Sequence, residues 1–448
     1  MSVATRHGLA LAASFLAGVS LTAVHSVWAE RDIATDNKLP LDELRTFTGV
    51  LDAVKEDYVE PVKDKDLLEN AIRGMLSNLD PHSAFLDAEA FQDLQVGTSG
   101  EFGGLGIEVG QEDGFIKVIA PIDDTPAQRA GIRAGDLIIR LDDTSVKGMA
   151  LSDAIQRMRG KPNTPITLTI VREGVRKPLK IKLVREVIQV KSVKSRLLEP
   201  GFAYVRITQF QAKTAQSLQQ ELQTLEQQNK APLKGLVLDL RNNPGGVLNG
   251  AVDVADDFLE DGVIVETKGR GNGSDQSYKA TPGDLLKNAS MVVLVNGGSA
   301  SASEIVAGAL QDHHRALILG ERTFGKGSVQ TILPLGNGTA VKLTTARYYT
   351  PSGRSIQAAG IDPDIKLKPL KVEADNGSES DFIKESDLTG HLRNDRADQI
   401  DNTPPDHPPD STKLVAPADG NLVQNDYQLY EALNLLKGMT LSQNRNNG

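Results

Sequence analysis

The chain has 448 residues, of which 39 % are hydrophobic and 24 % charged, values typical of a globular protein with room for two or three domains. Its formal net charge of −10 argues against a nucleic-acid partner. It contains no cysteine, which excludes a disulfide framework, a thiolate zinc site and a thiol protease.

The first 29 residues have the character of a secretory signal peptide. They carry one basic residue, Arg6, and no acid, and an apolar run extends from Leu9 to Val24. Val27 and Ala29 then offer small residues at the positions that a signal peptidase reads. The sequence therefore predicts a signal over residues 1–29 and an exported protein. The alternative is an uncleaved anchor that keeps the chain at the membrane, although the run is short for a bilayer span.

Residues 30–95 predict an N-terminal helical region. Apolar residues recur there at steps of three and four, first at Leu51, Val54 and Tyr58 and again between residues 67 and 76. The stretch Leu79–Ser83, Leu-Asp-Pro-His-Ser, predicts a turn.

Residues 96–187 predict a mostly β module with two short helices, at 126–130 and 151–159. The run Gly103-Gly104-Leu105-Gly106-Ile107 precedes a strand. Glycines there allow the backbone to turn with its N–H groups facing inward, a nest that suits a carboxylate. An ordinary glycine-rich turn is the alternative interpretation.

Residues 188–372 alternate strand and helix signals. Apolar runs of strand length lie at 202–207, 235–240, 291–296 and 316–319, and helical patterns lie between them at 213–228, 248–259 and 303–310. This alternation indicates an α/β domain. The fold class that follows is a multidomain α/β protein whose core domain carries the β module as an insertion.

The end of the chain contains two predicted segments, an acidic linker and a helix. Residues 373–425 predict an acidic, disordered linker, because residues 373–410 hold eleven acids and little apolar content. Residues 426–448 predict a C-terminal helix with an apolar stripe over 427–439, which must be buried somewhere. We expect a second copy of the chain to cover it.

A serine-rich segment follows the strand at 291–296 directly and opens the next helix. It contains Ser299, Ser301 and Ser303, and small residues at such a junction let a nucleophile approach a substrate backbone. The helix N-terminus favours a developing negative charge. Helix capping is the alternative role for these serines. Ser303 is expected inside the helix and Ser299 before the turn.

Two other segments supply what a nucleophilic serine needs. Lys326 stands between two glycines, and a buried lysine that loses its proton can serve as a base. The turn Asn242-Asn243-Pro244-Gly245-Gly246 offers backbone N–H groups for an oxyanion hole. The pair His313-His314 suggests two alternatives, a Ser-His triad or a metal site. Joint metal chelation by the two is disfavoured, because adjacent residues do not share a helix face.

The glycine nest and the run Ala130-Gly131-Ile132-Arg133-Ala134-Gly135-Asp136 together resemble a PDZ domain over residues 101–186. The resemblance implies that a peptide binds as an added strand. Its terminal carboxylate would then be held by the N–H groups of Leu105, Gly106 and Ile107, and the last side chain would lie in a pocket formed by the helix at 151–158.

Over residues 40–372 the chain resembles the carboxyl-terminal processing proteases. The motifs that carry this resemblance are Ser-Ala-Ser-Ala-Ser-Glu, Phe-Gly-Lys-Gly, Asn-Pro-Gly-Gly and the stretch 346–356. It implies a Ser/Lys serine peptidase with Ser301 as nucleophile, Lys326 as base and Gln330 holding the lysine. The oxyanion donors would be the N–H groups of Ala302 and of Gly245 or Gly246. No metal and no organic cofactor is expected.

The resemblance also sets expectations for partners and location. Substrates would be proteins with accessible apolar C-termini, and the enzyme would be exported to the bacterial periplasm or cell envelope. We expect a homo-oligomer assembled through the helical ends of the chain, with room for an activating adaptor protein and with a PDZ domain that controls access to the core. The alternative is a catalytically silent scaffold that gathers envelope proteins.

Overall fold

The computed structural model describes residues 39–122, 124–271, 273, 275–370 and 422–446. The predicted signal (1–29) and most of the predicted linker (373–425) lie outside these residues. The chain divides into two units, residues 1–75 and 76–448.

The described part of the first unit is helical, as the apolar spacing predicts. It contains α2 (Leu41–Asp57) and most of α3 (Asp64–Ser77), whose last two residues belong to the second unit. None of the side chains of α2 is buried. Leu44 and Phe47 are each 44 % exposed.

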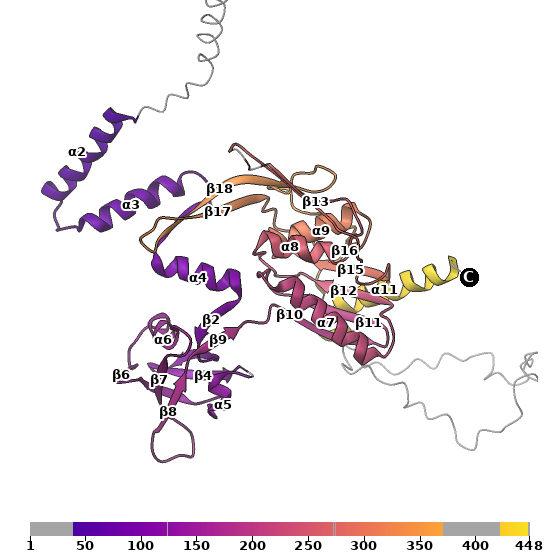
Figure 1. Ribbon diagram of the computed structural model, residues 1–448, viewed down its shortest axis with the longest axis horizontal. Helices are drawn as coiled ribbons and strands as arrows, with labels where there is room; N and C mark the ends of the chain where they lie inside the picture. Colours follow the sequence, from indigo (N-terminus) through magenta and orange to yellow (C-terminus); the bar gives the residue numbers. More distant parts are fainter. Residues whose placement is uncertain (1–38, 123, 272, 274, 371–421, 447–448) are drawn as a thin grey trace, which may run out of the picture. The chain divides into compact units, whose positions relative to one another are not determined.

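The second unit begins with β1 (Ala84–Leu86) and α4 (Ala88–Ser99), which lead into the PDZ-like module. A sheet of order β3-β4-β5-β7-β8, with β6 on β5, is antiparallel throughout, and β2 pairs with β9 as a separate ribbon. The helices of the module lie where the sequence predicts them (Figure 1). Its elements are β2 (Glu101–Gly104), β3 (Ile107–Glu112), β4 (Phe115–Pro121), α5 (Pro126–Arg129), β5 (Leu137–Leu141), β6 (Thr144–Ser145), α6 (Leu151–Met158), β7 (Pro165–Val171), β8 (Leu179–Val184) and β9 (Glu186–Gln189).

The α/β core is built on a sheet of order β10-β11-β12-β15-β16-β19. The edge strand β10 is antiparallel to β11, and the other neighbours are parallel. β12 and β15 are buried along their whole length, which explains their continuous apolar runs. The elements of this sheet and its helices are β10 (Val193–Glu199), β11 (Phe202–Ile207), α7 (Thr214–Asn229), β12 (Gly235–Asp239), α8 (Leu248–Asp256), β15 (Ser290–Val295), α9 (Ala302–Asp312), β16 (Leu317–Gly320) and β19 (Ile365–Lys366).

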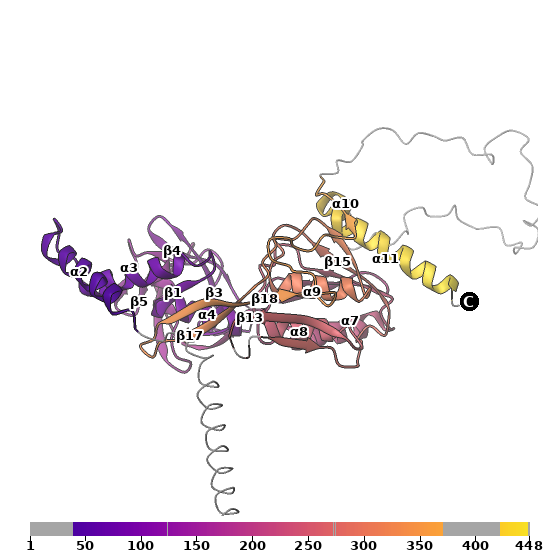
Figure 2. The same ribbon diagram turned by 90° about the horizontal axis from the view of Figure 1, so that it is seen from above.

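Successive residues of the core strands point to opposite faces of the sheet, and each face forms a separate apolar layer. Leu236, Leu238 and Val293 pack with α7, α8 and α9 on one face. Val237 and Val292, one residue out of step, pack on the other face with the C-terminal helix α11 (Tyr427–Asn446). Figure 2 shows this order of helix, sheet and helix.

The C-terminal helix therefore corrects one expectation. Its apolar stripe is covered by the sheet of its own chain and needs no second copy, since Leu429, Ala432, Leu433 and Leu436 are all at most 4 % exposed against β12 and β15. Gly235 makes the close approach possible, because a Cβ there would lie 2.7 Å from Leu436 Cγ. A short helix, α10 (Leu422–Asn425), precedes α11 inside the segment predicted as linker.

A second, antiparallel sheet lies beside the core. It has the order β1-β18-β13-β14, with β17 paired to β18 as a long hairpin. Sequence pattern alone did not identify these strands, which are β13 (Val263–Gly269), β14 (Gln276–Lys279), β17 (Ser328–Pro334) and β18 (Ala340–Tyr349). Burial along these strands follows neither a continuous buried run nor a regular alternation, so no local period marks them.

Candidate active site

Ser301 lies in a sharp turn between β15 and α9, at the carboxyl end of a parallel strand. Its φ of 55° and ψ of −111° belong to a region that non-glycine residues rarely adopt. A strained strand-to-helix turn of this kind presents a nucleophile at the top of an α/β sheet. Ser301 is also the N-cap of α9, so the positive end of the helix faces the site.

The other two serines of the motif have structural partners. Ser299 and Ser303 are fully buried. Ser299 Oγ donates to the Leu240 carbonyl at 2.8 Å, and Ser303 Oγ donates to the Asn243 carbonyl at 2.9 Å. Ser301 retains 8 % exposure. Of the three serines, Ser301 is therefore the one that retains exposure, while Ser299 lies before the turn and Ser303 within α9.

Glu304, in the first turn of α9, links two segments. One is residues 299–303, which contain the candidate nucleophile (the nucleophile segment), and the other is residues 323–326, which end in Lys326 (the lysine segment). Its carboxylate is fully buried and accepts four hydrogen bonds. Oε2 accepts from the Ser301 N–H at 2.7 Å and from the Lys326 N–H at 2.9 Å. Oε1 accepts from the Thr323 hydroxyl at 2.5 Å and from the Gly325 N–H at 2.7 Å. One carboxylate oxygen therefore holds the backbones of both proposed catalytic residues.

Nothing in the sequence assigns this role to Glu304. Its donors in the lysine segment lie 19 to 22 residues further along the chain. The only signal is the glutamate three residues after an N-cap serine, which is half of a capping box.

Lys326 is half-buried at the base of the β17–β18 hairpin. Burial lowers the pKa of its ammonium group below the usual value, and the positive charge of Lys342 lowers it further, against the opposing effects of Glu304 and Asp80. Within the described residues, no hydrogen bond or ion pair engages the Lys326 side chain. Both features suit a lysine that must give up its proton.

The turn after β12 is fastened to the nucleophile segment. The Asn243 carbonyl accepts hydrogen bonds from the Ala300 N–H at 3.0 Å and from Ser303 Oγ at 2.9 Å. Gly245 lies directly against Ser301, because a Cβ at that position would be 2.8 Å from Ser301 Cβ. A side chain there would fill the space in front of Ser301.

Of the N–H groups beside this space, one already donates a hydrogen bond and two do not. The Gly245 N–H donates to Asn243 Oδ1 at 2.9 Å. In the part of the chain that the structure describes, the N–H groups of Gly246 and Ala302 have no acceptor. These two groups are therefore available to a ligand, whereas that of Gly245 is not.

Gln330 does not bond to Lys326 in this structure. Its Nε2 donates to Ser328 Oγ at 2.9 Å and to Thr344 Oγ1 at 3.2 Å. Thr344 Oγ1 in turn donates to Asp80 Oδ1 at 3.1 Å. Gln330 thus joins the hairpin to the turn at 79–83, whose contribution to this site the sequence did not reveal.

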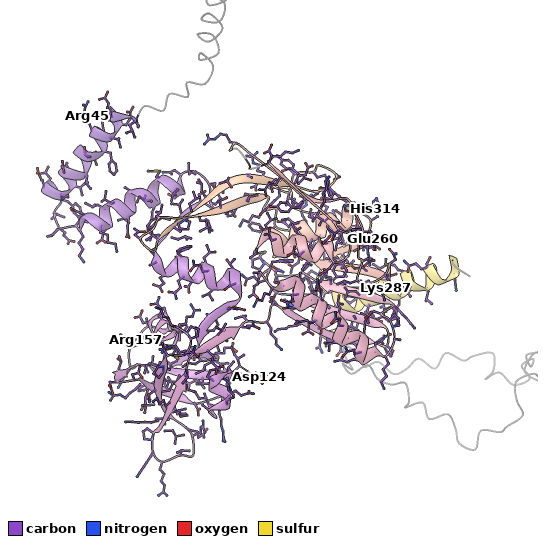
Figure 3. All side chains as sticks on the ribbon, viewed as in Figure 1. Arg45, Asp124, Arg157, Glu260, Lys287 and His314 are labelled. Carbon is purple, nitrogen blue, oxygen red and sulfur yellow. The ribbon has the colours of Figure 1, made fainter. Side chains whose placement is uncertain are left out.

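The paired histidines are remote from the serine. His313 caps the far end of α9, eleven residues from Ala302, and its Nε2 lies 2.7 Å from the Val263 carbonyl oxygen. His314 is exposed on the surface of the core (Figure 3). An α-helix rises about 1.5 Å per residue, so neither ring reaches Ser301.

The PDZ-like module contains an apolar cavity next to its glycine-rich loop. A cavity of 190 Å³ is lined by Leu105, Gly106, Ile107 and, from α6, Ile155 and Met158. The N–H groups of Leu105 and Gly106 have no acceptor among the described residues. Gly106 has a φ of 75°, and a Cβ there would lie 2.3 Å from Thr125 Cβ, so only glycine fits this loop.

The described residues contain no cluster of three or more metal-ligating side chains. None of the helices in the described ranges is long and apolar enough to cross a bilayer.

Comparison with known proteins agrees with this architecture. Residues 201–367 match the model of peptidase family S41, residues 103–183 that of the PDZ domain, and residues 12–90 that of the activating protease CtpB N-terminal domain.

Two relatives cover most of this chain. A carboxy-terminal-processing protease of Bartonella bacilliformis is 47 % identical over 427 residues, 95 % of each chain. A carboxyl-terminal-processing protease of Synechocystis is 37 % identical over 73 % of this chain and 78 % of its own. The solved photosystem II D1 C-terminal processing protease is 34 % identical, with a TM-score of 0.42 over 72 % of this chain and 87 % of its own. On the sequence relatives, the chain belongs to the carboxyl-terminal processing proteases of peptidase family S41, which makes it a serine peptidase with a PDZ domain.

Proposed function

We propose that the protein hydrolyses peptide bonds with a Ser301/Lys326 dyad through an acyl-enzyme. Neutral Lys326 takes the Ser301 hydroxyl proton as Oγ attacks the scissile carbonyl carbon. The lysine then returns the proton to the leaving amine, and a water molecule, deprotonated in the same way, releases the acyl group. No step needs a metal or an organic cofactor.

The observation that carries this proposal is the shared Glu304 oxygen. Because Oε2 accepts from the N–H groups of both Ser301 and Lys326, the two backbones are held at one point. The lowered pKa of Lys326 supports the base role, and the strained turn supports Ser301 as nucleophile.

The oxyanion hole is proposed to consist of the N–H groups of Ala302 and Gly246. Both lack an acceptor in the described chain, whereas the Gly245 N–H is engaged by Asn243. Gly245 contributes by leaving space in front of Ser301. Gln330 is proposed to turn toward Lys326 when substrate binds and to exchange its present hydroxyl partners for the lysine.

Substrate choice is proposed to lie in the PDZ groove. The N–H groups of Leu105, Gly106 and Ile107 would hold a C-terminal carboxylate, and the apolar cavity beside α6 would take an aliphatic last side chain. The substrates are then proteins with accessible apolar C-termini. Export to the bacterial periplasm or cell envelope, membrane attachment, homo-oligomers and an activating adaptor belong to the same proposal.

A protein-degradation assay tests it. Ser301→Ala should abolish cleavage of casein, and Ser217→Ala, a change of the same size on α7, should leave it intact. Both chains should keep the wild-type melting temperature within a degree or two, since one hydroxyl is lost in each. Cleavage of casein by Ser301→Ala at the wild-type rate would refute the dyad and show that another residue is the nucleophile.

A further inference from the structure

Besides its apolar packing, the C-terminal helix is joined to the core by a polar network around Arg241. Arg241 lies two residues beyond the end of β12, and Asp426 is the residue just before α11, 185 residues later. Their side chains form a bidentate pair, with Nη1 to Oδ1 at 2.8 Å and Nη2 to Oδ2 at 2.7 Å. Such paired hydrogen bonds fix orientation as well as distance.

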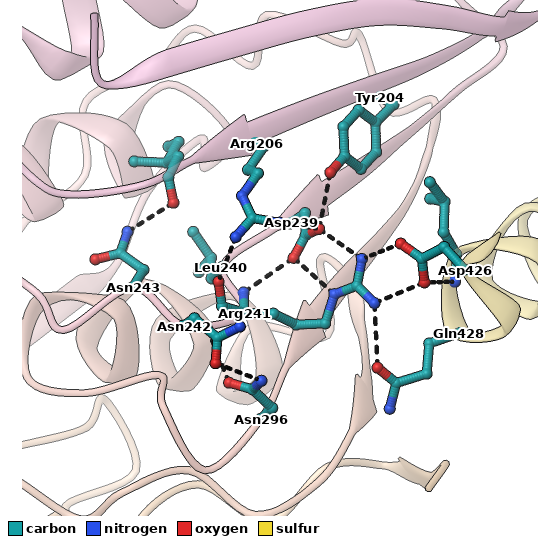
Figure 4. A network of polar contacts seen from close by, with 12 residues as sticks. Tyr204, Arg206, Asp239, Leu240, Arg241, Asn242, Asn243, Asn296, Asp426 and Gln428 are labelled. Carbon is teal, nitrogen blue, oxygen red and sulfur yellow. Dashed lines mark hydrogen bonds and ion pairs between the residues drawn. The ribbon is translucent and has the colours of Figure 1, made fainter. Parts of the chain in front are cut away.

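All five N–H groups of the Arg241 guanidinium are engaged (Figure 4). Nε and Nη2 donate to the two oxygens of Asp239, at 3.0 and 2.7 Å. The remaining donors go to Asp426 and to Gln428 Oε1, the latter at 3.1 Å. Of the three acceptor side chains, Gln428 therefore belongs to α11 and Asp426 directly precedes it.

The network is mostly buried and nearly balanced in charge. Asp239 is fully buried, and the Arg241 side chain is 11 % exposed. Arg206 lies 3.6 Å from Asp239 and supplies a second positive charge. Burial opposes ionisation of Asp426, yet its hydrogen bonds and ion pair with Arg241 hold the pKa of this carboxyl below its usual value.

The backbone of Arg241 leads directly into the proposed oxyanion turn. Its N–H donates to Asp239 Oδ1 at 2.9 Å. The next residue, Asn242, is held from both sides by Asn296, with bonds of 2.9 and 3.0 Å. Asn243 then fastens the turn to the nucleophile segment. Hydrogen bonds thus fix Arg241, Asn242 and Asn243 in turn, and we expect a shift of Arg241 to move the N–H groups beside Ser301.

We propose that Asp426 is a positioning residue for peptide hydrolysis, which holds Arg241 and through it the Asn242–Gly246 turn against Ser301. The inference rests on the proposed function, because the turn acts only if it forms the oxyanion hole. The C-terminal helix is then part of the catalytic domain, although a long segment separates it from the core in sequence.

The test uses the full chain with Asp426→Asn, which keeps the size of the side chain and removes its charge. We expect kcat on a peptide substrate to fall about 10- to 100-fold with KM little changed, because the oxyanion contact is made in the transition state. The affinity for a peptide boronate, which mimics the tetrahedral intermediate, should fall in parallel with kcat. Asp426→Glu, which keeps the carboxylate, should recover most of the loss.

Lys437→Gln is the matched control on the same helix. It breaks the pair with Glu199 at 3.0 Å, on the part of α11 away from the turn, and should leave kcat unchanged. If Asp426→Asn fails to fold, Gln428→Met removes a single acceptor from Arg241 and should still lower kcat about 3- to 5-fold.

The outcomes separate the two proposals. A wild-type kcat in Asp426→Asn or in folded Gln428→Met, with Ser301→Ala inactive, would overturn the positioning role alone. An equal fall of kcat in Lys437→Gln would also overturn it, because a loosened helix would then explain the loss. Full activity of Ser301→Ala would overturn both proposals.

Discussion

The protonation state of Lys326 determines whether the proposed dyad can act. The ammonium form is inactive as a base, so activity should rise as pH increases through the lowered pKa of this lysine. Lys342→Gln removes a neighbouring positive charge, which should raise that pKa and move the rising limb of kcat/KM to higher pH. Lys287→Gln, the same change at an exposed site of the core (Figure 3), should leave the limb in place. A pH–rate profile that coincides for all three chains would contradict the lysine-base assignment.

Glu304 gives a second prediction at the level of single residues. Glu304→Gln sets an amide NH₂ against two N–H or O–H donors in a buried site, which should cost about 2 to 4 kcal/mol of stability. The loosened Ser301 and Lys326 segments should lower kcat at least about 10-fold. Calorimetry and peptide kinetics measure both effects. Glu321→Gln, outside the cluster, is the control, and wild-type values in Glu304→Gln would show that the carboxylate holds neither segment.

The difference between Ser301 and Glu304 explains what sequence can predict about this site. The serine is marked locally, by small residues between a strand and a helix. The function of Glu304 depends on donors that reach it only after folding, about twenty residues away in the chain. The same holds for Gln330, whose present partners Ser328 and Thr344 were not foreseeable from its spacing to Lys326.

The PDZ groove is an element-scale feature with a direct test. Ile155→Asp places a charge in the apolar cavity beside α6, so cleavage of a protein with an apolar C-terminus should fall about 10-fold or more. Gln156→Asp makes the same charge change on the exposed side of α6 and should be silent. Gly106 is not suitable for such a test, because any side chain there collides with Thr125 and disturbs the fold. Unchanged cleavage by Ile155→Asp would remove the groove from substrate recognition.

Elements with strong local periodicity were predictable, and their partners were not. The parallel strands and their helices agree with the apolar runs to within a few residues, because buried parallel strands are apolar throughout. The apolar stripe of α11 indicated burial without indicating against what. Its actual cover, β12 and β15, depends on Gly235 and on the sheet face left open by α7, α8 and α9.

At the scale of the whole molecule, the helical N-terminal end is the remaining surface through which we expect copies of the chain to associate, because Leu44 and Phe47 of α2 are exposed. Phe47→Glu should therefore lower the mass measured by light scattering if α2 joins copies of the chain. Thr46→Glu, on a neighbouring exposed position, should not change that mass. An assembly of the same mass in both variants would exclude α2 as the contact.

The most direct test of the Ser301/Lys326 mechanism is to identify the serine that a phosphonylating probe modifies and to measure the rate of that reaction. Full-length protein is treated with a small fluorophosphonate probe over a range of pH, and the modified residue is identified by peptide-mapping mass spectrometry. We predict one adduct, on Ser301, whose rate of formation rises with pH and is lost in Lys326→Arg, because arginine keeps its proton at these pH values. An adduct on Ser299 or Ser303, or labelling of Lys326→Arg at the wild-type rate, would contradict the Ser301/Lys326 mechanism.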